Sequence, residues 1–255
     1  MIPLLWALLG GCADDPREPV VVFAAASLTD AFRDLEAAYE AEHPGADVQL
    51  VSAGSQVLRL QIAQGAPADV VASADPRHLD ALVASGDVAA YHPLAQNELV
   101  VIVPSDDTGV ASIDAFAALD QAERLVVGAD GVPVGDYTRQ LLTRAGAELG
   151  PGFLQGVEAR VVSRESNARL VRAKVQLGEA DAAVVYRTDA NDDVRVIEVP
   201  SGLNVRATYG IAPVVDAAHG EAAHAFVTYT RSPAGQRILA AHGFLPAPGT
   251  ESARR

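Results

Sequence analysis

The chain has 255 residues, 49% of them hydrophobic, which is enough for one large or two small packed domains. Its formal net charge is −14, from 33 acidic and 19 basic residues, so it lacks the basic footprint that nucleic-acid binding requires. The same charge weighs against an anionic ligand at first sight. Exposed charges beyond about 10 Å are largely screened at physiological salt, however, so local donors can outweigh them.

The N-terminus has the pattern of an export signal with a lipid attachment site. Residues 1–9 are an apolar run too short to span a bilayer, and residues 9–12 (LGGC) resemble the lipobox of bacterial lipoproteins, in which the cysteine carries lipid after cleavage. No Lys or Arg precedes the run, so a non-lipidated export signal is the alternative. We expect residues 1–19 to be signal and tether, with lipidation at Cys12. Because Cys12 is the only cysteine, the mature domain has no disulfides.

Two strand-to-helix junctions, each marked by a serine, follow along the chain. The apolar strand 20–25 leads to Ser27 and an amphipathic helix, and a second strand leads to Gly54, Ser55 and a helix over residues 56–64. Glycine lets a ligand approach the main chain closely. A serine here is by itself an ordinary N-cap, but helix N-termini also offer unpaired N–H groups that bind anions. Two such junctions at neighbouring parallel strands would face one crevice.

Strand and helix patterns alternate through the rest of the chain, which predicts an α/β fold with mainly parallel strands. A third buried strand follows the turn at residues 65–69. The further strands are expected at 98–104, 125–128, 182–186, 194–199 and 209–215, and the further helices at 112–119, from the loop 132–137 to about 145, 168–177, 221–230 and 233–241.

The sequence lacks the usual motifs of catalytic and metal sites. The six histidines show no metal-ligand spacing, and Asp69 and Asp75 are better explained as turn and helix-capping residues. No phosphate-binding Gly-Lys-Ser/Thr loop and no Gly-x-Ser-x-Gly elbow is present, so nucleotide hydrolysis and acyl transfer lack their usual parts. We therefore expect neither an enzyme nor a site for a metal cation.

A series of short motifs carries a family resemblance. They are 24–29 (AAASLT), 65–69 (GAPAD), 73–75 (SAD), 97–100 (NELV), 132–137 (VPVGDY), 178–186 (GEADAAVVY), 232–236 (SPAGQ) and 242–244 (HGF). Each motif alone is weak, but all of them in this order make the match specific. Over residues 20–244 the chain resembles the molybdate/tungstate-binding proteins of bacterial ABC importers, a branch of the type II periplasmic binding proteins.

The resemblance implies two α/β lobes, residues 20–95 plus 208–255 and residues 96–207. They are joined by two crossover strands, near 95–100 and 205–213, with the ligand between the lobes. It also implies a monomeric protein of the periplasm or cell envelope, held there through Cys12. Such a protein has no cofactor and passes its oxyanion to an ABC transporter permease in the membrane.

The resemblance also implies a binding site made of neutral hydrogen-bond donors. They are the hydroxyl and N–H of Ser27 and of Ser55, the N–H of Val134, the N–H of Ala168 (or of Asn167 or Arg169), and the hydroxyl of Tyr186. Donors alone suit a fully deprotonated dianion, whereas protonated phosphate would need a carboxylate acceptor. The sequence does not tell whether the ligand is molybdate or tungstate. A binding protein for another oxyanion such as sulfate, or an oxyanion-sensing ectodomain, is the alternative.

Overall fold

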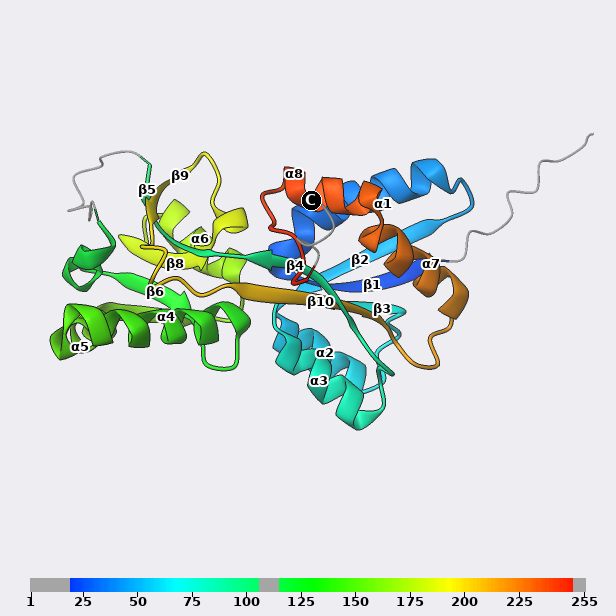
Figure 1. Ribbon diagram of the computed structural model, residues 1–255, viewed down its shortest axis with the longest axis horizontal. Helices are drawn as coiled ribbons and strands as arrows, with labels where there is room; N and C mark the ends of the chain where they lie inside the picture. The colour runs from blue at the N-terminus through cyan, green and yellow to red at the C-terminus, as the bar shows by residue number, and fades with distance from the viewer. Residues whose placement is uncertain (1–18, 106–114, 250–255) are drawn as a thin grey trace, which may run out of the picture.

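The computed structural model describes residues 19–105 and 115–249, which form two lobes, each built on one five-stranded sheet (Figure 1). Residues 1–18 of the expected signal and tether, with Cys12, lie outside the described residues, whereas Pro19, expected in the tether, already belongs to the first strand. Part of the helix expected at 112–119 also lies outside the described residues; its described end is a short 3₁₀ helix, η2 (Phe116–Gln121). No helix in the described part of the chain is long and apolar enough to cross a membrane.

The first lobe contains the sheet β2-β1-β3-β10-β4. Its strands are β1 (Pro19–Ala25), β2 (Asp47–Ala53), β3 (Val70–Ser73), β4 (His92–Asn97) and β10 (Ala207–Pro213). One face is covered by η1 (Ala26–Leu28), α1 (Thr29–Glu42), α7 (Gly220–Arg231) and α8 (Pro233–Ala241), and the other by α2 (Ser55–Ala63) and α3 (Pro76–Ser85). Phe32 and Phe226 pack under the first group of helices, and Leu58 and Leu79 under the second.

The second lobe contains the sheet β7-β6-β8-β5-β9. Its strands are β5 (Leu99–Pro104), β6 (Leu125–Gly128), β7 (Val161–Glu165), β8 (Ala182–Tyr186) and β9 (Val194–Glu198). The helices are α4 (Pro133–Leu149), α5 (Pro151–Arg160) and α6 (Ala168–Gln176), with the short 3₁₀ helix η3 (Arg187–Asp189) after β8. Five consecutive residues of β5, from Leu99 to Val103, are fully buried, as expected for a strand covered on both faces.

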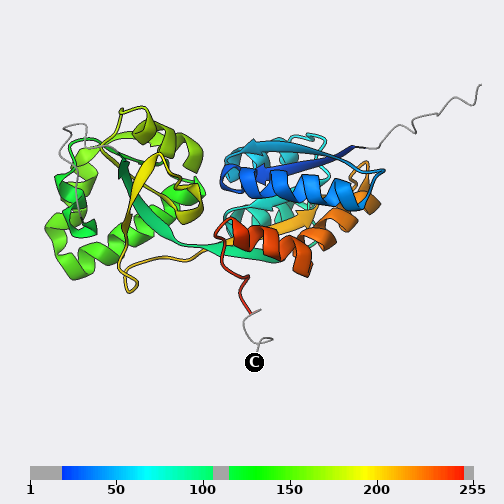
Figure 2. The same ribbon diagram turned by 90° about the horizontal axis from the view of Figure 1, so that it is seen from above.

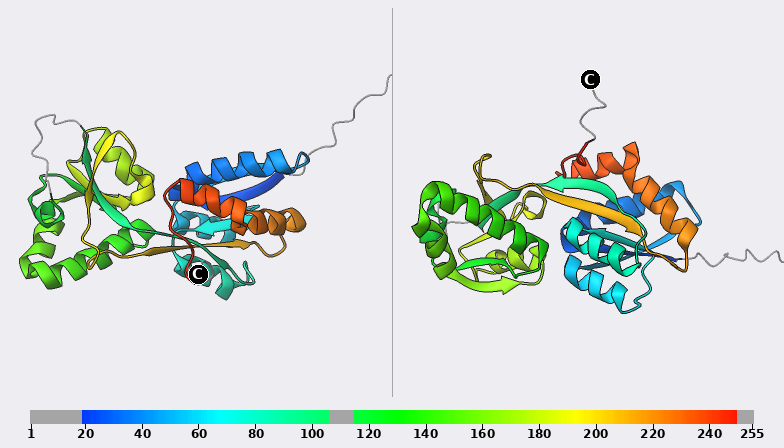
Figure 3. Two further views of the ribbon diagram at one scale, coloured as in Figure 1. Left: turned by 45° about the horizontal axis from the view of Figure 1, so that its top comes forward. Right: turned by 60° about the horizontal axis from the view of Figure 1, so that its bottom comes forward.

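The chain passes between the lobes twice, and the two passages lie side by side (Figures 2 and 3). Only Glu98 separates β4 from β5, and β10 pairs with β4 so that Ala207 lies opposite Asn97. In each sheet four strands run in one direction, and only β10 or β5 runs the other way. The expected two-lobed α/β fold with mainly parallel strands and two crossovers is therefore confirmed. The lobe boundaries at 95/96 and 207/208 stay a prediction.

Three helical details differ from the sequence expectation. Helix α3 was not expected, although Asp75 caps it by accepting the N–H of Arg77 at 2.9 Å and Gly86 ends it with a φ of 86°. Helix α5 was also missed, and α4 continues past Gly146. A Cβ on Gly146 would lie 3.4 Å from Leu154, at the edge of ordinary van der Waals contact, so this glycine faces α5 within a continuous helix.

The start of α4 is pressed against the end of β6. A Cβ on Gly135 would lie 2.3 Å from the carbonyl oxygen of Ala129 and 2.4 Å from that of Gly128, and backbone atoms there cannot move aside independently. Only glycine allows this approach, which fixes the first turn of α4 and with it the position of Val134.

We predict that Gly135→Ala destabilises the protein by about 1–3 kcal/mol, because the added methyl forces α4 away from β6. Urea unfolding measures the change in the free energy of unfolding. Gly152→Ala in α5 is the control: nothing lies within 4 Å of its Cβ position, so its stability should stay equal or rise slightly. Equal stabilities for the Gly135 variant and the parent would contradict this packing account.

Candidate anion-binding site

A small pocket lies between the lobes and is lined by residues of both. The five residues predicted from the sequence, Ser27, Ser55, Val134, Ala168 and Tyr186, all line it. The other lining residues are Ala25, Ala26, Gly54, Ala74, Val132, Pro133 and Asn167. No lining residue carries a carboxylate, an ammonium or a guanidinium group. The fold thus brings the predicted residues together in an uncharged pocket, and their contact with an anion stays a prediction.

The two serines reach the pocket from different kinds of helix start. Ser27 lies in η1, next to the N-cap residue of α1, and its side chain caps neither helix. Ser55 is the first residue of α2, so its N–H has no partner inside the helix. Both side chains are buried. Each serine therefore offers its hydroxyl to something other than its own helix.

Neighbouring groups form hydrogen bonds with both serine hydroxyls. The oxygen of Ser55 accepts the N–H of Ala74 at 3.1 Å, so its own proton remains to be donated. The hydroxyl of Ser27 lies 3.0 Å from that of Tyr209, which in turn lies 3.4 Å from Nδ2 of Asn97. An amide nitrogen only donates, so Asn97 donates to the hydroxyl of Tyr209; when Tyr209 donates in turn to Ser27, the Ser27 proton is available to the pocket.

These supporting residues were not predicted from the sequence as part of the site. Asn97 and Ala74 fall within the family motifs, but nothing in the motifs assigns them a role. The side chain of Asn97 is oriented by its Oδ1, which accepts the N–H of Glu98 at 2.9 Å. Tyr209 lies 112 residues further along the chain, so only the pairing of β10 with β4 brings it to Asn97.

The second lobe contributes N–H groups at two helix starts. Pro133 opens α4 and has no N–H, so Val134 presents the first N–H of this helix. Ala168 is the first residue of α6, where Asn167 caps the helix by accepting the N–H of Leu170 at 3.0 Å. N–H groups at these positions have no intrahelical partner, and the helix dipole adds positive potential. Of the alternatives to Ala168, Asn167 lines the pocket, whereas Arg169 does not.

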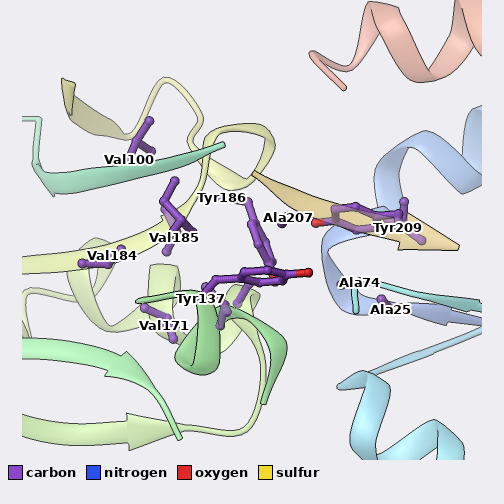
Figure 4. Packing of buried hydrophobic residues seen from close by; sticks show 14 of the residues in the cluster. Ala25, Ala74, Val100, Tyr137, Val171, Val184, Val185, Tyr186, Ala207 and Tyr209 are labelled. Carbon is purple, nitrogen blue, oxygen red and sulfur yellow. The ribbon is translucent and has the colours of Figure 1, made fainter. Parts of the chain in front are cut away.

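Tyr186 ends β8 and turns its ring toward the pocket beside two other tyrosines (Figure 4). Its ring centre lies 5.8 Å from that of Tyr209 and 6.4 Å from that of Tyr137. Its hydroxyl is buried and has no hydrogen-bond partner among the described residues. Burial raises the pKa of Tyr186 well above its ordinary value, so this group stays protonated at physiological pH and can donate.

A buried acid, Asp189, follows Tyr186 in η3. Its Oδ2 has no hydrogen-bond partner among the described residues. Burial raises the pKa of Asp189 to about 7, and the positive charges of Arg172 and Arg169 only partly oppose this. The guanidinium of Arg172 donates to the backbone oxygen of Asp189, at 2.9 Å. Near neutral pH this carboxyl is therefore divided between its protonated and ionised forms.

The chain is similar to known proteins over most of its length. A family model described as bacterial extracellular solute-binding protein matches residues 20–245. The molybdate-binding protein ModA of Mycobacterium tuberculosis is 35% identical over 231 residues, which cover 88% of this chain and 84% of ModA. ModA of Escherichia coli is 32% identical over 253 residues, 94% of each chain. The Azotobacter vinelandii periplasmic molybdate-binding protein superposes with a TM-score of 0.77 at 19% identity, covering 89% of this chain and 98% of that one.

We predict that Asp189→Asn changes how stability depends on pH. The pKa of Asp189 is about 7 in the folded protein against an ordinary 3.8, so the folded state holds this proton more tightly. Its contribution to stability is complete below about pH 4 and is lost as the pH rises through about 7. Asparagine cannot ionise and avoids that loss, so the stability of the variant relative to the parent should rise between pH 4.5 and pH 8.

Urea unfolding of both proteins across this pH range measures the difference. Gly152→Ala, which changes no ionisable group, provides the control and should keep the pH dependence of the parent. A constant difference between the Asp189 variant and the parent at every pH would show that this carboxyl does not titrate as described.

Proposed function

The chain belongs to the bacterial extracellular solute-binding proteins, and we propose that it captures molybdate or tungstate between its lobes for an ABC transporter permease. This family consists of binding proteins, so the chain is a binding protein and not an enzyme. The similarity to ModA of two organisms, over most of each chain, supports the choice of oxyanion.

The observation that carries the proposal is the set of neutral donors around one pocket. Ser27, Ser55 and Tyr186, which carry hydroxyls, line it together with first-turn residues of α2, α4 and α6, and no lining residue is a carboxylate. A tetrahedral dianion without protons accepts hydrogen bonds on every oxygen, so such a pocket satisfies it. Protonated phosphate also carries an O–H, for which this pocket offers no carboxylate acceptor.

The number of donors is sufficient for tight binding. A hydrogen bond to a charged group contributes about 1.5–3 kcal/mol net. Five to seven of them, less an association cost of about 4–15 kcal/mol, allow dissociation constants below micromolar. Because the donors come from both lobes, the anion binds most tightly when the lobes are close together. Binding therefore favours closure.

We also propose the place where the protein works. The family acts outside the cytoplasmic membrane. The residues 9–12 (LGGC) support a lipid anchor at Cys12, followed by a polar tether that leads to β1. A monomer held in the periplasm or cell envelope in this way would remain within reach of its permease while its lobes open and close.

The ligand class is tested by calorimetric titration of the chain from Ala13 onward with molybdate, tungstate, sulfate and phosphate. We expect submicromolar binding of molybdate and tungstate, weaker binding of sulfate, and much weaker binding of phosphate. Binding should also raise the melting temperature with increasing anion concentration, by mass action. Equal or tighter binding of phosphate or sulfate would defeat the assignment to molybdate and tungstate.

The site itself is tested by removing single hydroxyls. Ser27→Ala, Ser55→Ala and Tyr186→Phe each remove one donor, and each should weaken molybdate binding by about 1.5–3 kcal/mol, which is roughly tenfold to more than a hundredfold. The effects should not add, because the three donors share one ligand and one closure equilibrium.

Matched controls for these variants are Ser85→Ala and Tyr91→Phe, which remove hydroxyls that bond only within the first lobe, outside the pocket. Both should bind molybdate like the parent. If the three site variants also bind like the parent, the anion lies elsewhere on the molecule.

A further inference from the structure

Arg169 reaches from the second lobe to the first at the edge of the pocket. It follows Ala168 in the first turn of α6, and its Nε donates to the carbonyl oxygen of Ala26 at 2.8 Å. Its guanidinium also forms an ion pair with Asp30, in the first turn of α1. Ala26 directly precedes Ser27, so this one side chain links the neighbours of two proposed anion donors in opposite lobes.

Further contacts show how closely the lobes approach, among them the ion pair of Arg77 in α3 with Asp136 in α4, at 2.8 Å. The amide Nε2 of Gln56 in α2 donates to the carbonyl oxygen of Ser166 at 2.8 Å. Gly54 faces the same oxygen: a Cβ there would lie only 2.4 Å from it. That Gly54 admits a ligand near the main chain stays a prediction; the structure shows that the opposite lobe approaches it closely.

We propose that Arg169 is a positioning residue. Its contacts with Ala26 and Asp30, here called the clasp, hold the two lobes together and so strengthen oxyanion binding. The identity of the ligand as an oxyanion rests on the proposed function above. The contact between the lobes does not depend on it. The contacts of Arg169 with Ala26 and Asp30 form only while the lobes are close, so they lower the free energy of the closed arrangement. When only the closed arrangement binds fully, the apparent dissociation constant is the intrinsic one divided by the closed fraction. A larger closed fraction therefore gives tighter binding.

The chemistry of arginine suits this position. The planar guanidinium presents donors in a fixed fork, so it can serve the carbonyl of Ala26 and the carboxylate of Asp30 at the same time. The carbonyl oxygen of Ala26 is the negative end of a peptide dipole, and the carboxylate of Asp30 carries a negative charge. The positive charge of Arg169 offsets both beside a pocket that is proposed to hold an anion. The hydrogen bond with Arg169 lowers the pKa of Asp30, as expected when a guanidinium stabilises its ionised form. A lysine would keep the charge without the fork.

The structure supplies a matched control in Arg33. This arginine also faces Asp30, at 3.8 Å, but it lies on the same helix, three residues further along. It therefore contributes a similar charge to the same carboxylate without joining the lobes. A variant of Arg33 separates the effect of charge near Asp30 from the effect of a link between lobes.

The clasp is tested first by the distance between the lobes. In a Cys12→Ser background, spin labels on Leu60→Cys in α2 and Leu177→Cys after α6 report that distance, since both positions are exposed and belong to different lobes. Without added oxyanion, Arg169→Met should shift the distance distribution away from the closed arrangement, Arg169→Lys less so, and Arg33→Met not at all. Gly54→Ala is the positive control. Its methyl would collide with the opposite lobe, so this variant should shift the distance distribution toward the open arrangement.

The second test is binding of molybdate and tungstate by the same variants. Arg169→Met should weaken binding by about three- to thirtyfold, mainly through faster dissociation, with Arg169→Lys in between and Arg33→Met unchanged. Weaker binding with an unchanged distance distribution would overturn the clasp, because Arg169 would then act on the anion directly. Unchanged distances together with unchanged affinity would overturn it as well. If the parent binds neither anion, the proposed function fails, and the distance measurement alone decides on the clasp.

Discussion

The whole arrangement depends on parallel strands that end at a common edge in each lobe. The carboxyl ends of such strands, and the helix starts that follow them, necessarily point the same way. The pocket is lined by residues that end or follow β1, β2 and β3 in one lobe and β6, β7 and β8 in the other. The two crossover passages set these two edges against each other (Figure 3). A site made of backbone N–H groups needs this topology, because no single helix start supplies enough donors for a tetrahedral dianion.

The sequence predicted the parts of this site that depend on short stretches of chain. A buried strand followed by a small residue and a helix start is a local pattern, and Ser27, Ser55 and Tyr186 could each be placed from such a pattern together with the family motifs. Helix α3 was missed although Asp75 and Pro76 mark its start and Leu79, Leu82 and Val83 have helical spacing, so its signal was present in the sequence.

The second partners of the donors could not be predicted in this way. The contact of Ser27 with Tyr209 joins residues 182 positions apart, and that of Asn97 with Tyr209 joins residues 112 positions apart. The second depends on the register of β10 against β4, which shifts between Tyr209 and Gly210, and the first on the sheet order that places β10 beside β3, the neighbour of β1. Register is set by packing of the whole sheet and by such irregularities, and neither is visible in a local motif. The contact of Arg169 with Ala26 depends in addition on how the two lobes meet.

The net charge of −14 raises the question of how an acidic protein would hold a dianion. Close to the pocket the acidic side chains are individually compensated. Asp75 is buried against Arg77, and Asp30 is paired with Arg169. Asp189, the one of these three without a side-chain cation bonded to it, has its pKa raised to about 7 by burial, which removes part of its charge at neutral pH. The remaining acidic groups are mainly exposed and screened by salt, so the nearby neutral donors dominate the potential inside the pocket. Binding strength is then governed by donor geometry and by the closeness of the lobes, and the overall charge has little influence on it.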